Sequence, residues 1–384
     1  MDDIELDDVL ATVRAFVRTQ VVPLEEQIDR TDEVPEHVRE QAKKMGLYGF
    51  TIPEEFGGLG LDVVQESRLV FELGWTTPAL RSLFGTNNGI AGHVLMDGGT
   101  QAQKAEWLPQ LASGDVVASF ALTEAEAGSD PAALRTTARR DGDDFVLNGS
   151  KRYITNAPLA DLFMVFARTG DTGKASKDIS VFLVPAGSSG LTVGPHDRKM
   201  GQQGAWTADV HLDEVRVPAS ALVGGTADSG YATAMSCLAH GRVHIAALGV
   251  GMAQRLVDET VRYAADRVQG GKPIGEHQLV QAMIADSLTE TMAGRSLVLD
   301  VARAYVDGSD RRLGPSAAKL FCSEMVGRVA DRAVQVHGGA GYMRTVAVER
   351  FYRDARLFRI YEGTSQIQQL IIAGQALRAV SERP

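Results

Sequence analysis

The chain has 384 residues, of which 44% are hydrophobic and 23% charged, and its formal net charge is −10. This length suggests about two or three domains, and two cysteines exclude a disulfide framework or a cysteine-rich zinc module. The acidic balance argues against a general surface for nucleic acid or acidic membranes. No apolar run approaches the roughly 20 residues that span a bilayer, and the acidic N-terminus is unlike a secretory signal. We therefore expect a soluble, cytoplasmic protein.

The first hundred residues have the periodicity of helices. Apolar residues recur at three- and four-residue steps between Leu6 and Val17, which places them on one helix face. Asp7 and Asp8 are expected in the first turn of this helix, and Pro23 is expected to end or kink it. Two further helical patterns follow, over residues 36–45 and 62–73, with a glycine-containing loop between them over residues 53–60.

From about residue 116 to residue 223 the pattern becomes that of β-strands. Short β-branched or aromatic runs, separated by Gly, Pro, Asp and Asn, are typical of a sheet domain. The runs are 145–147, 179–184, 191–193 and 210–212. Asn148 and Gly149 predict a tight turn before Tyr153 and Ile154, and the polar segment 170–177 predicts a surface loop.

The remainder of the chain, from about residue 229, is helical in pattern. Three long helices are predicted over 241–266, 278–306 and 315–337, and a last one over about 365–380. Pro315 fits a first helical position, and Gly338 fits the residue after a helix end. We therefore predict three domains: 1–116 (helical), 117–226 (β) and 227–384 (helical bundle).

Familiar catalytic and binding motifs are missing from the sequence. It has no complete Rossmann glycine fingerprint, Walker loop, H-E-x-x-H or C-x-x-C. His240 and His244 have the i,i+4 spacing of metal ligands on a helix. No third ligand is apparent near them in the sequence, and two histidines on a partly exposed helix are common. We therefore expect no metal site.

Six segments, in order, carry a resemblance to a known family. They are 118–130, 147–156, 241–242, 267–278, 335–342, and 353–356 with 361–366. Together they resemble the acyl-CoA dehydrogenase family over nearly the whole chain. The resemblance implies an α+β multi-domain fold, with an N-terminal helical domain, a middle β-sheet domain and a C-terminal four-helix bundle. It also implies a homotetramer with one FAD per subunit.

The reaction that this resemblance implies is α,β-dehydrogenation of an acyl-CoA, with electrons passed to an electron-transferring flavoprotein. A base removes the α proton, and burial brings its pKa towards that of the carbon acid. The family motif assigns this role to Glu362, although an isolated loop glutamate is often only a solvated carboxylate or a helix-start acid. One branch of the family takes its base from the residue before Arg242, but Gly241 stands there and cannot serve.

The resemblance also implies residues that contact FAD. Backbone N–H groups of segment 120–129 and the Thr123 hydroxyl can hydrogen-bond the flavin ring, and Tyr153 can pack on it. Arg267 is the expected pyrophosphate partner, across a subunit boundary. The implied FAD-binding residues are Phe120, Leu122, Thr123, Gly128, Ser129, Tyr153, Thr155, Arg267, Gln269, His277, Gln278, Gln335, Gly338, Gly339, Thr364 and Gln366.

The substrate contacts implied by the resemblance are Ser129, Arg242, Tyr361 and Gly363. The medium-chain branch has a carboxylate three residues before the arginine, where this chain has Ala239 followed by His240. This departure leaves CoA recognition and acyl chain length open.

Three other readings of the sequence remain. An acyl-CoA oxidase discharges its flavin on oxygen, but oxidases usually have an extra C-terminal domain that this sequence lacks. Family monooxygenases lack the glutamate at position 362. A catalytically silent scaffold of the same fold is disfavoured by the presence of Glu362 and of the flavin-loop segment.

Overall fold

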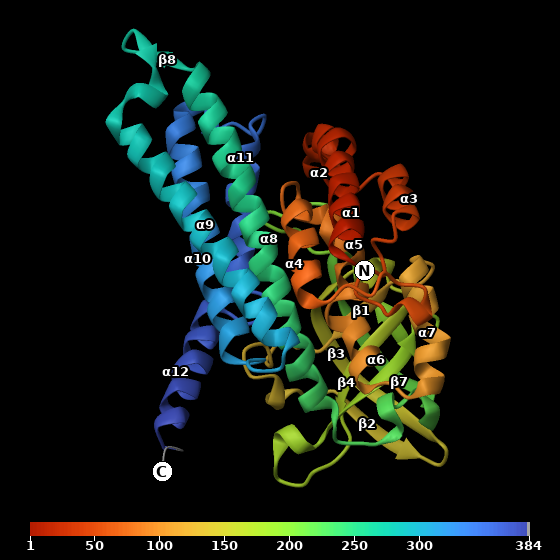
Figure 1. Ribbon diagram of the computed structural model, residues 1–384. Helices are drawn as coiled ribbons and strands as arrows, with labels where there is room; N and C mark the ends of the chain where they lie inside the picture. Colours follow the sequence, from red (N-terminus) through yellow and green to blue (C-terminus); the bar gives the residue numbers. More distant parts are fainter. Residues whose placement is uncertain (382–384) are drawn as a thin grey trace.

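The computed structural model describes residues 1–381, in which helices at both ends of the chain flank a β-sheet (Figure 1). This order confirms the predicted α+β architecture of helical, β and helical segments. Residues 382–384, which belong to the predicted third domain, lie outside the described residues. No helix within residues 1–381 combines the length and the apolar character needed to cross a membrane.

The N-terminal segment forms seven helices. They are α1 (Asp3–Phe16), α2 (Glu25–Thr31), α3 (Glu36–Lys44), α4 (Val63–Leu73), α5 (Pro78–Asn88), α6 (Ile90–Gly98) and α7 (Gln101–Ser113). The expectation that Asp7 and Asp8 occupy the first turn of α1 is wrong. Asp2 and Glu5 form a capping box that starts the helix earlier. Beyond α1 the chain passes through a π turn and then a 3₁₀ turn that contains Pro23, which confirms the predicted interruption.

The middle segment forms a seven-stranded sheet. Its strands are β1 (Ala118–Ala121), β2 (Thr137–Asp141), β3 (Asp144–Thr155), β4 (Leu162–Arg168), β5 (Ile179–Pro185), β6 (Leu191–Val193) and β7 (Thr207–Pro218). The hydrogen-bonded order is β1-β4-β2-β3-β7-β6, with β5 paired to β4. The long β3 and β7 pair antiparallel along most of their length, and Thr155 at the end of β3 pairs with Thr207.

The predicted tight turn at Asn148 and Gly149 is wrong, because both residues lie inside the continuous strand β3. The register between β3 and β7 shifts here, as in a β-bulge. Gly149 has φ 153°, and a Cβ atom on it would lie 2.4 Å from Thr136 Oγ1. The glycine therefore serves close packing, and the Asn148 side chain donates to Glu214 across the sheet.

The C-terminal segment is dominated by long helices. They are α8 (Gly230–Asp266), α9 (Gln278–Val306), α10 (Leu313–His337), α11 (Ala347–Ala355) and α12 (Ser365–Ser381), with a small hairpin of β8 (Val268–Gln269) and β9 (Lys272–Pro273) between α8 and α9. Pro315 is the third residue of α10 and not the first as expected. The Asp310 carboxylate accepts hydrogen bonds from the backbone N–H groups of Leu313 and Gly314, so the helix begins two residues before Pro315. Gly338 follows the end of α10, as predicted.

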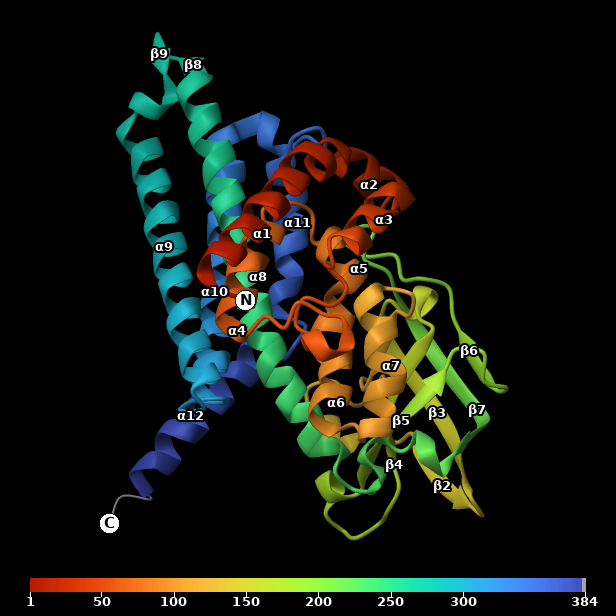
Figure 2. The ribbon, with the colours of Figure 1, turned by 45° about the vertical axis from the view of Figure 1, so that its right-hand side comes forward.

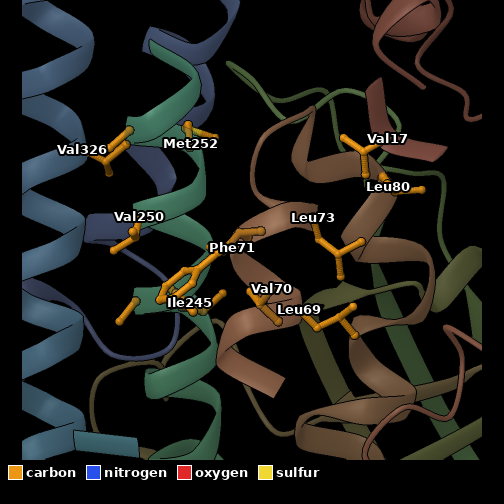
Figure 3. Packing of buried hydrophobic residues seen from close by; sticks show 14 of the residues in the cluster. Val17, Leu69, Val70, Phe71, Leu73, Leu80, Ile245, Val250, Met252 and Val326 are labelled. Carbon is orange, nitrogen blue, oxygen red and sulfur yellow. The ribbon is translucent and has the colours of Figure 1, made fainter. Parts of the chain in front are cut away.

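Helix α8 joins the two helical segments. It packs against α4 on one side and against α9 and α10 on the other (Figure 2). A Cβ atom on Gly251 would lie 2.3 Å from the Phe71 carbonyl oxygen, so α4 and α8 meet with their backbones in contact. Phe71, Val70 and Ile245 fill the space beside this contact (Figure 3). This tight contact joins α8 to the N-terminal helical segment.

Candidate active site

A cavity of about 580 Å³ lies where the sheet, the N-terminal half of α8 and the loop before α12 meet. Its volume is in the range of about 300–1,000 Å³ that is typical of small-molecule sites. Eleven of the predicted site residues line it: Phe120, Leu122, Thr123, Gly128, Ser129, Tyr153, Thr155, Arg242, Tyr361, Glu362 and Gly363. Residues far apart in the sequence are therefore gathered around one space.

The loop that carries Glu362 is held in an unusual backbone conformation. Glu362 and Gly363 have φ values of 54° and 88°, which lie in the left-handed region that costs a non-glycine residue about 1–3 kcal/mol. Lys319 Nζ donates to the Gly363 carbonyl at 2.6 Å, and Gln368 Nε2 donates to the carbonyls of Glu362 and Gly363 at 3.1 and 3.0 Å. These bonds fix the loop and aim the Glu362 side chain at the cavity.

The Glu362 carboxyl lies in a largely desolvated environment. Its Oε2 is buried and has no hydrogen-bond partner within the described chain. Burial raises the pKa of Glu362, and the positive charges of Arg81, Arg242 and Lys319 oppose this rise. Such a carboxyl is protonated at a higher pH than an exposed one and is a stronger base when ionised. The arrangement suits a group that accepts a proton from a weak acid.

Gly241 provides the space that Glu362 occupies. A Cβ atom on Gly241 would lie 3.0 Å from Glu362 Oε2 and 3.2 Å from Ile90 Cγ2. The next residue, Arg242, is buried, and its Nη1 donates weakly to Ser316 Oγ at 3.5 Å. Burial lowers the pKa of Arg242, and the Glu362 carboxyl opposes this effect. Gly241 and the predicted substrate contact Arg242 therefore shape the surroundings of the Glu362 carboxyl.

The segment after β1 is supported by a buried ion pair. Lys151 Nζ lies 2.8 Å from Glu124 Oε1 and also donates to the Leu122 carbonyl at 3.2 Å. Glu124 accepts three more hydrogen bonds, from Arg135 N and from the N and Oγ1 of Thr136. This pair holds the backbone next to Thr123, which lines the cavity.

The end of β3 presents an aromatic side chain to the cavity. Tyr153 is 58% exposed, has φ 57°, and lies under the Arg152 guanidinium at 5.0 Å. The hydroxyls of Thr123, Ser129 and Thr155 also line the cavity, and within residues 1–381 they make no hydrogen bond. An exposed ring beside free hydroxyls matches a planar ligand with polar edges.

The other predicted cofactor residues do not line this cavity within one chain. Arg267, Gln269, His277 and Gln278 surround the β8–β9 hairpin, at the far end of α8 from the sheet (Figure 2). Gln335, Gly338 and Gly339 lie at the end of α10, and Thr364 and Gln366 at the start of α12. Their roles stay predictions.

Several residues at the site escaped sequence reasoning. Arg81 and Lys319 place positive charge near Glu362, and the pair of Lys151 and Glu124 supports the loop. Arg311 and Arg312 line the cavity from the connection between α9 and α10. The adjacent Arg311 and Arg312 in a turn could have indicated a site for an anion. A single basic residue within a helical pattern, such as Arg81 or Lys319, gives no such indication.

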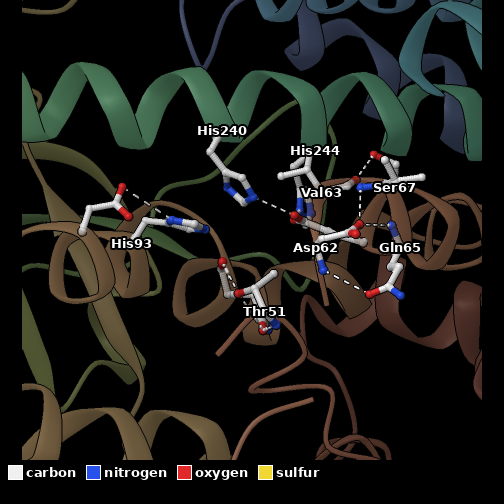
Figure 4. A network of polar contacts seen from close by, with 12 residues as sticks. Thr51, Asp62, Val63, Gln65, Ser67, His93, His240 and His244 are labelled. Atoms are coloured by element: carbon white, nitrogen blue, oxygen red, sulfur yellow. Dashed lines mark hydrogen bonds and ion pairs between the residues drawn. The ribbon is translucent and has the colours of Figure 1, made fainter. Parts of the chain in front are cut away.

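The expectation that His240 and His244 lie on a partly exposed helix face is wrong, because both are buried. One ring nitrogen of each histidine lies 2.6 Å from a different carboxylate oxygen of Glu66, which accepts the hydrogen bond (Figure 4). Glu66 lies on α4, far away in the sequence, so spacing along α8 could not reveal it. The described residues contain no group of three or more metal-ligating side chains arranged to hold an ion.

Comparisons with known proteins cover nearly the whole chain. Family models match as the acyl-CoA dehydrogenase N-terminal domain (residues 4–115), middle domain (119–215) and C-terminal domain (228–377). An acyl-CoA dehydrogenase of Bacillus subtilis is 39% identical over 94% of this chain and 95% of its own. A subunit of the caffeyl-CoA reductase–Etf complex of Acetobacterium woodii is 36% identical over 92% of this chain and 93% of its own. The structure of a glutaryl-CoA dehydrogenase of Mycobacterium smegmatis with FADH2 has a TM-score of 0.92 and 32% identity, over 99% of this chain and 95% of that one.

Proposed function

The chain belongs to the acyl-CoA dehydrogenase family, and on this premise we propose that it converts an acyl-CoA thioester to the trans-2-enoyl-CoA with Glu362 as base. The observation that carries the proposal is the unpartnered Glu362 Oε2, which lies at a cavity that the predicted flavin-contacting residues also line. A desolvated carboxylate is matched to a carbon acid better than an exposed one. The thioester α carbon would bind within reach of this oxygen.

The enzyme is an FAD-dependent oxidoreductase, as its family is. The cavity residues fit a flavin, because Tyr153 offers an exposed ring, and Thr123, Ser129 and Thr155 offer hydroxyls that make no hydrogen bond within residues 1–381. When bound, FAD supplies the hydride acceptor that no ordinary side chain provides. We propose that the segment after β1 and the end of β3 hold its ring. The ion pair of Lys151 and Glu124 keeps that segment in place.

The side chains around the thioester would perform separate tasks in this proposal. Glu362 accepts the α proton and becomes neutral, and burial favours the neutral form. Lys319 and Gln368 hold the loop backbone through its carbonyl oxygens. Arg242, Arg311 and Arg312 supply positive charge along the same cavity, which suits the phosphates of coenzyme A.

We propose an electron-transferring flavoprotein as the electron acceptor. The support is the relative from Acetobacterium woodii, which is named as a subunit of a reductase–Etf complex. The alternatives are an acyl-CoA oxidase, in which oxygen takes the electrons, and a silent scaffold. Glu362 Oε2 is buried and has no hydrogen-bond partner within residues 1–381, which argues against a scaffold, because a buried carboxylate without function is costly to keep.

We also propose that the chain forms a homotetramer. Large apolar side chains on α9 and α12 are exposed, namely Leu279, Leu288, Met292, Leu370 and Leu377. Large apolar side chains left exposed on helices are a feature of protein–protein contact surfaces. Arg267 and its neighbours do not line the cavity of their own chain, which is consistent with contacts to the FAD of another subunit.

The proposed function is tested by anaerobic mixing of the purified flavoprotein with a panel of acyl-CoA thioesters. We expect at least one thioester to bleach the oxidised-flavin absorbance, and we expect enoyl-CoA as product. The Glu362→Gln variant should keep FAD and bind the thioester but turn over about 10²–10⁴-fold more slowly. Near-normal bleaching by this variant would remove Glu362 from the mechanism.

A further inference from the structure

A buried polar network lies behind the cavity, between α4, α5, α6 and α8 (Figure 4). Arg81 Nε donates to His244 Nε2 at 2.7 Å, so this nitrogen must carry a lone pair. His244 therefore holds its proton on Nδ1 and donates to Glu66 Oε1 at 2.6 Å. Glu66 Oε2 accepts from His240 Nε2, also at 2.6 Å. Arg81 Nε, both Glu66 oxygens and three ring nitrogens are thus engaged in hydrogen bonds within this network.

Two ring nitrogens next to this network have no partner. His240 Nδ1 and His93 Nε2 are both buried, and within residues 1–381 neither makes a hydrogen bond. The two rings lie side by side, with their centroids 3.9 Å apart. The other nitrogen of His93 faces Asp97, at 3.8 Å from Oδ2. Unpaired buried polar atoms are uncommon in folded proteins, so two at one place call for an explanation.

The histidine pair lies next to the wall of the active-site cavity. His240 follows Ala239, which lines the cavity, and His93 is one helical turn after Ile90, which also lines it. Tyr305 lines the cavity and meets the His240 ring edge-on, with centroids 6.2 Å apart. His93 keeps 18% of its side chain exposed. Neither histidine lines the cavity itself, but each adjoins residues that do.

The same part of α8 carries the contact with the base. Gly241, directly after His240, lies under the Glu362 carboxyl. An acyl chain whose α carbon is at Glu362 and which extends between α6 and α8 therefore approaches His93 and His240. A hydrocarbon end would leave both nitrogens unpaired beside the buried charges of Glu66 and Arg81. A hydroxyl at that end could donate to such a nitrogen when the ring is neutral, and a carboxylate oxygen could accept from it when the ring is protonated.

We propose that His93 and His240 select acyl groups whose far end carries a hydrogen-bonding oxygen, as a hydroxyl or a carboxylate. This inference rests on the proposed dehydrogenation of an acyl-CoA and names the substrate class of that reaction. The pair acts on specificity and takes no part in proton or hydride transfer. A site that presents buried polar groups to a substrate rejects an analogue that leaves them unpaired.

The experiment compares matched pairs of thioesters by steady-state turnover and by flavin bleaching. Each pair consists of an ω-hydroxyacyl-CoA or ω-carboxyacyl-CoA and the methyl-ended acyl-CoA with the same chain length in heavy atoms. For the best pair we expect kcat/KM to be higher for the oxygenated member by about tenfold or more. In His93→Phe, which keeps a ring of similar size, this preference should disappear. His93→Gln, which keeps a hydrogen-bonding group, should retain part of it.

His211→Phe provides the matched control, because His211 is an exposed histidine on β7 and not a cavity residue. It should keep the wild-type preference. Equal or better turnover of the methyl-ended members by the wild type would overturn the inference, as would an unchanged preference in His93→Phe. If the methyl-ended members bleach the flavin well, only the substrate class is wrong. If no thioester of either kind bleaches it, the proposed function itself fails, and the inference fails with it.

Discussion

The Glu362 carboxyl packs directly against the backbone of α8 at Gly241, where a Cβ atom would lie 3.0 Å from Glu362 Oε2. A glycine inside a helix usually costs about 0.5–1 kcal/mol relative to alanine. At this position the missing side chain leaves room for the proposed base. A glycine that is unfavourable for helix stability is therefore favourable for the geometry of the site.

Gly241→Ala should stabilise α8 locally but displace the Glu362 side chain. We expect kcat to fall by up to about 10²-fold, because small displacements of a reacting group are costly. FAD content should remain normal, as measured by absorbance. Gly249→Ala is the control on the same helix, since its Cβ would lie 3.4 Å from the nearest atom, the Cys322 carbonyl oxygen. Equal kcat values for the two variants would show that Gly241 does not shape the position of the base.

The pH dependence of turnover should report the charge near Glu362. Burial raises the pKa of Glu362, while Lys319 lowers it. Because the ionised form is the base, activity is lost as pH falls through this pKa. Removing the positive charge in Lys319→Met raises the pKa further, so the acid limb of the kcat/KM profile should move to higher pH.

Lys43→Met is the control for this shift, because Lys43 pairs with Glu40 on the surface of α3. Its profile should coincide with that of the wild type. A Lys319→Met limb that stays in place, or moves to lower pH, would contradict the assigned electrostatics.

Removing one partner of the buried ion pair of Lys151 and Glu124 should destabilise the fold more than replacing both. Lys151→Met leaves the Glu124 carboxylate without its cation, which costs about 3–5 kcal/mol for a buried pair. The double variant Lys151→Met/Glu124→Gln should be less destabilised than the single one in chemical unfolding. Both should retain less FAD, because the segment after β1 loses its support. A double variant that is less stable than Lys151→Met would contradict this account.

Arg267→Ala should weaken FAD retention and oligomer formation together. A charge-assisted hydrogen bond contributes about 1.5–3 kcal/mol, which corresponds to roughly 10- to 100-fold in affinity. Released flavin and sedimentation velocity would measure the two effects. Arg262→Ala is the control, because Arg262 lies nearby on α8 and, within residues 1–381, pairs with Glu259 alone. Normal FAD content and an unchanged oligomer in Arg267→Ala would place this arginine outside the FAD site.

Reduced enzyme with bound product should react slowly with oxygen and rapidly with an electron-transferring flavoprotein. A closed site excludes water and oxygen from the face of the flavin that the enoyl thioester covers. Stopped-flow reoxidation of the product complex in aerated buffer would compare the two acceptors. Peroxide formation at the rate of turnover would identify an oxidase instead.

The sequence by itself determined the order of helical and β segments, and through its family resemblance it predicted Glu362 as the base. The 3.6-residue period predicted α9 with the bounds that the structure has, because a helix is made of contacts within four residues. Glu362 could be predicted as the base because its motif is local and continuous. In the same way, residues 120–129 could be predicted as a flavin-contacting segment from one short stretch of sequence.

Tertiary structure alone decided what surrounds these residues. Asn148 and Gly149 have a strong local preference for a turn, yet close packing against Thr136 places them within a strand. Lys319 reaches the carbonyl of Gly363, 44 residues away, and His240 reaches Glu66, 174 residues away. The sequence periodicity of one helix or strand does not show which side chains of other elements will contact it. The charges that set the pKa of Glu362 are therefore fixed by how the helices pack.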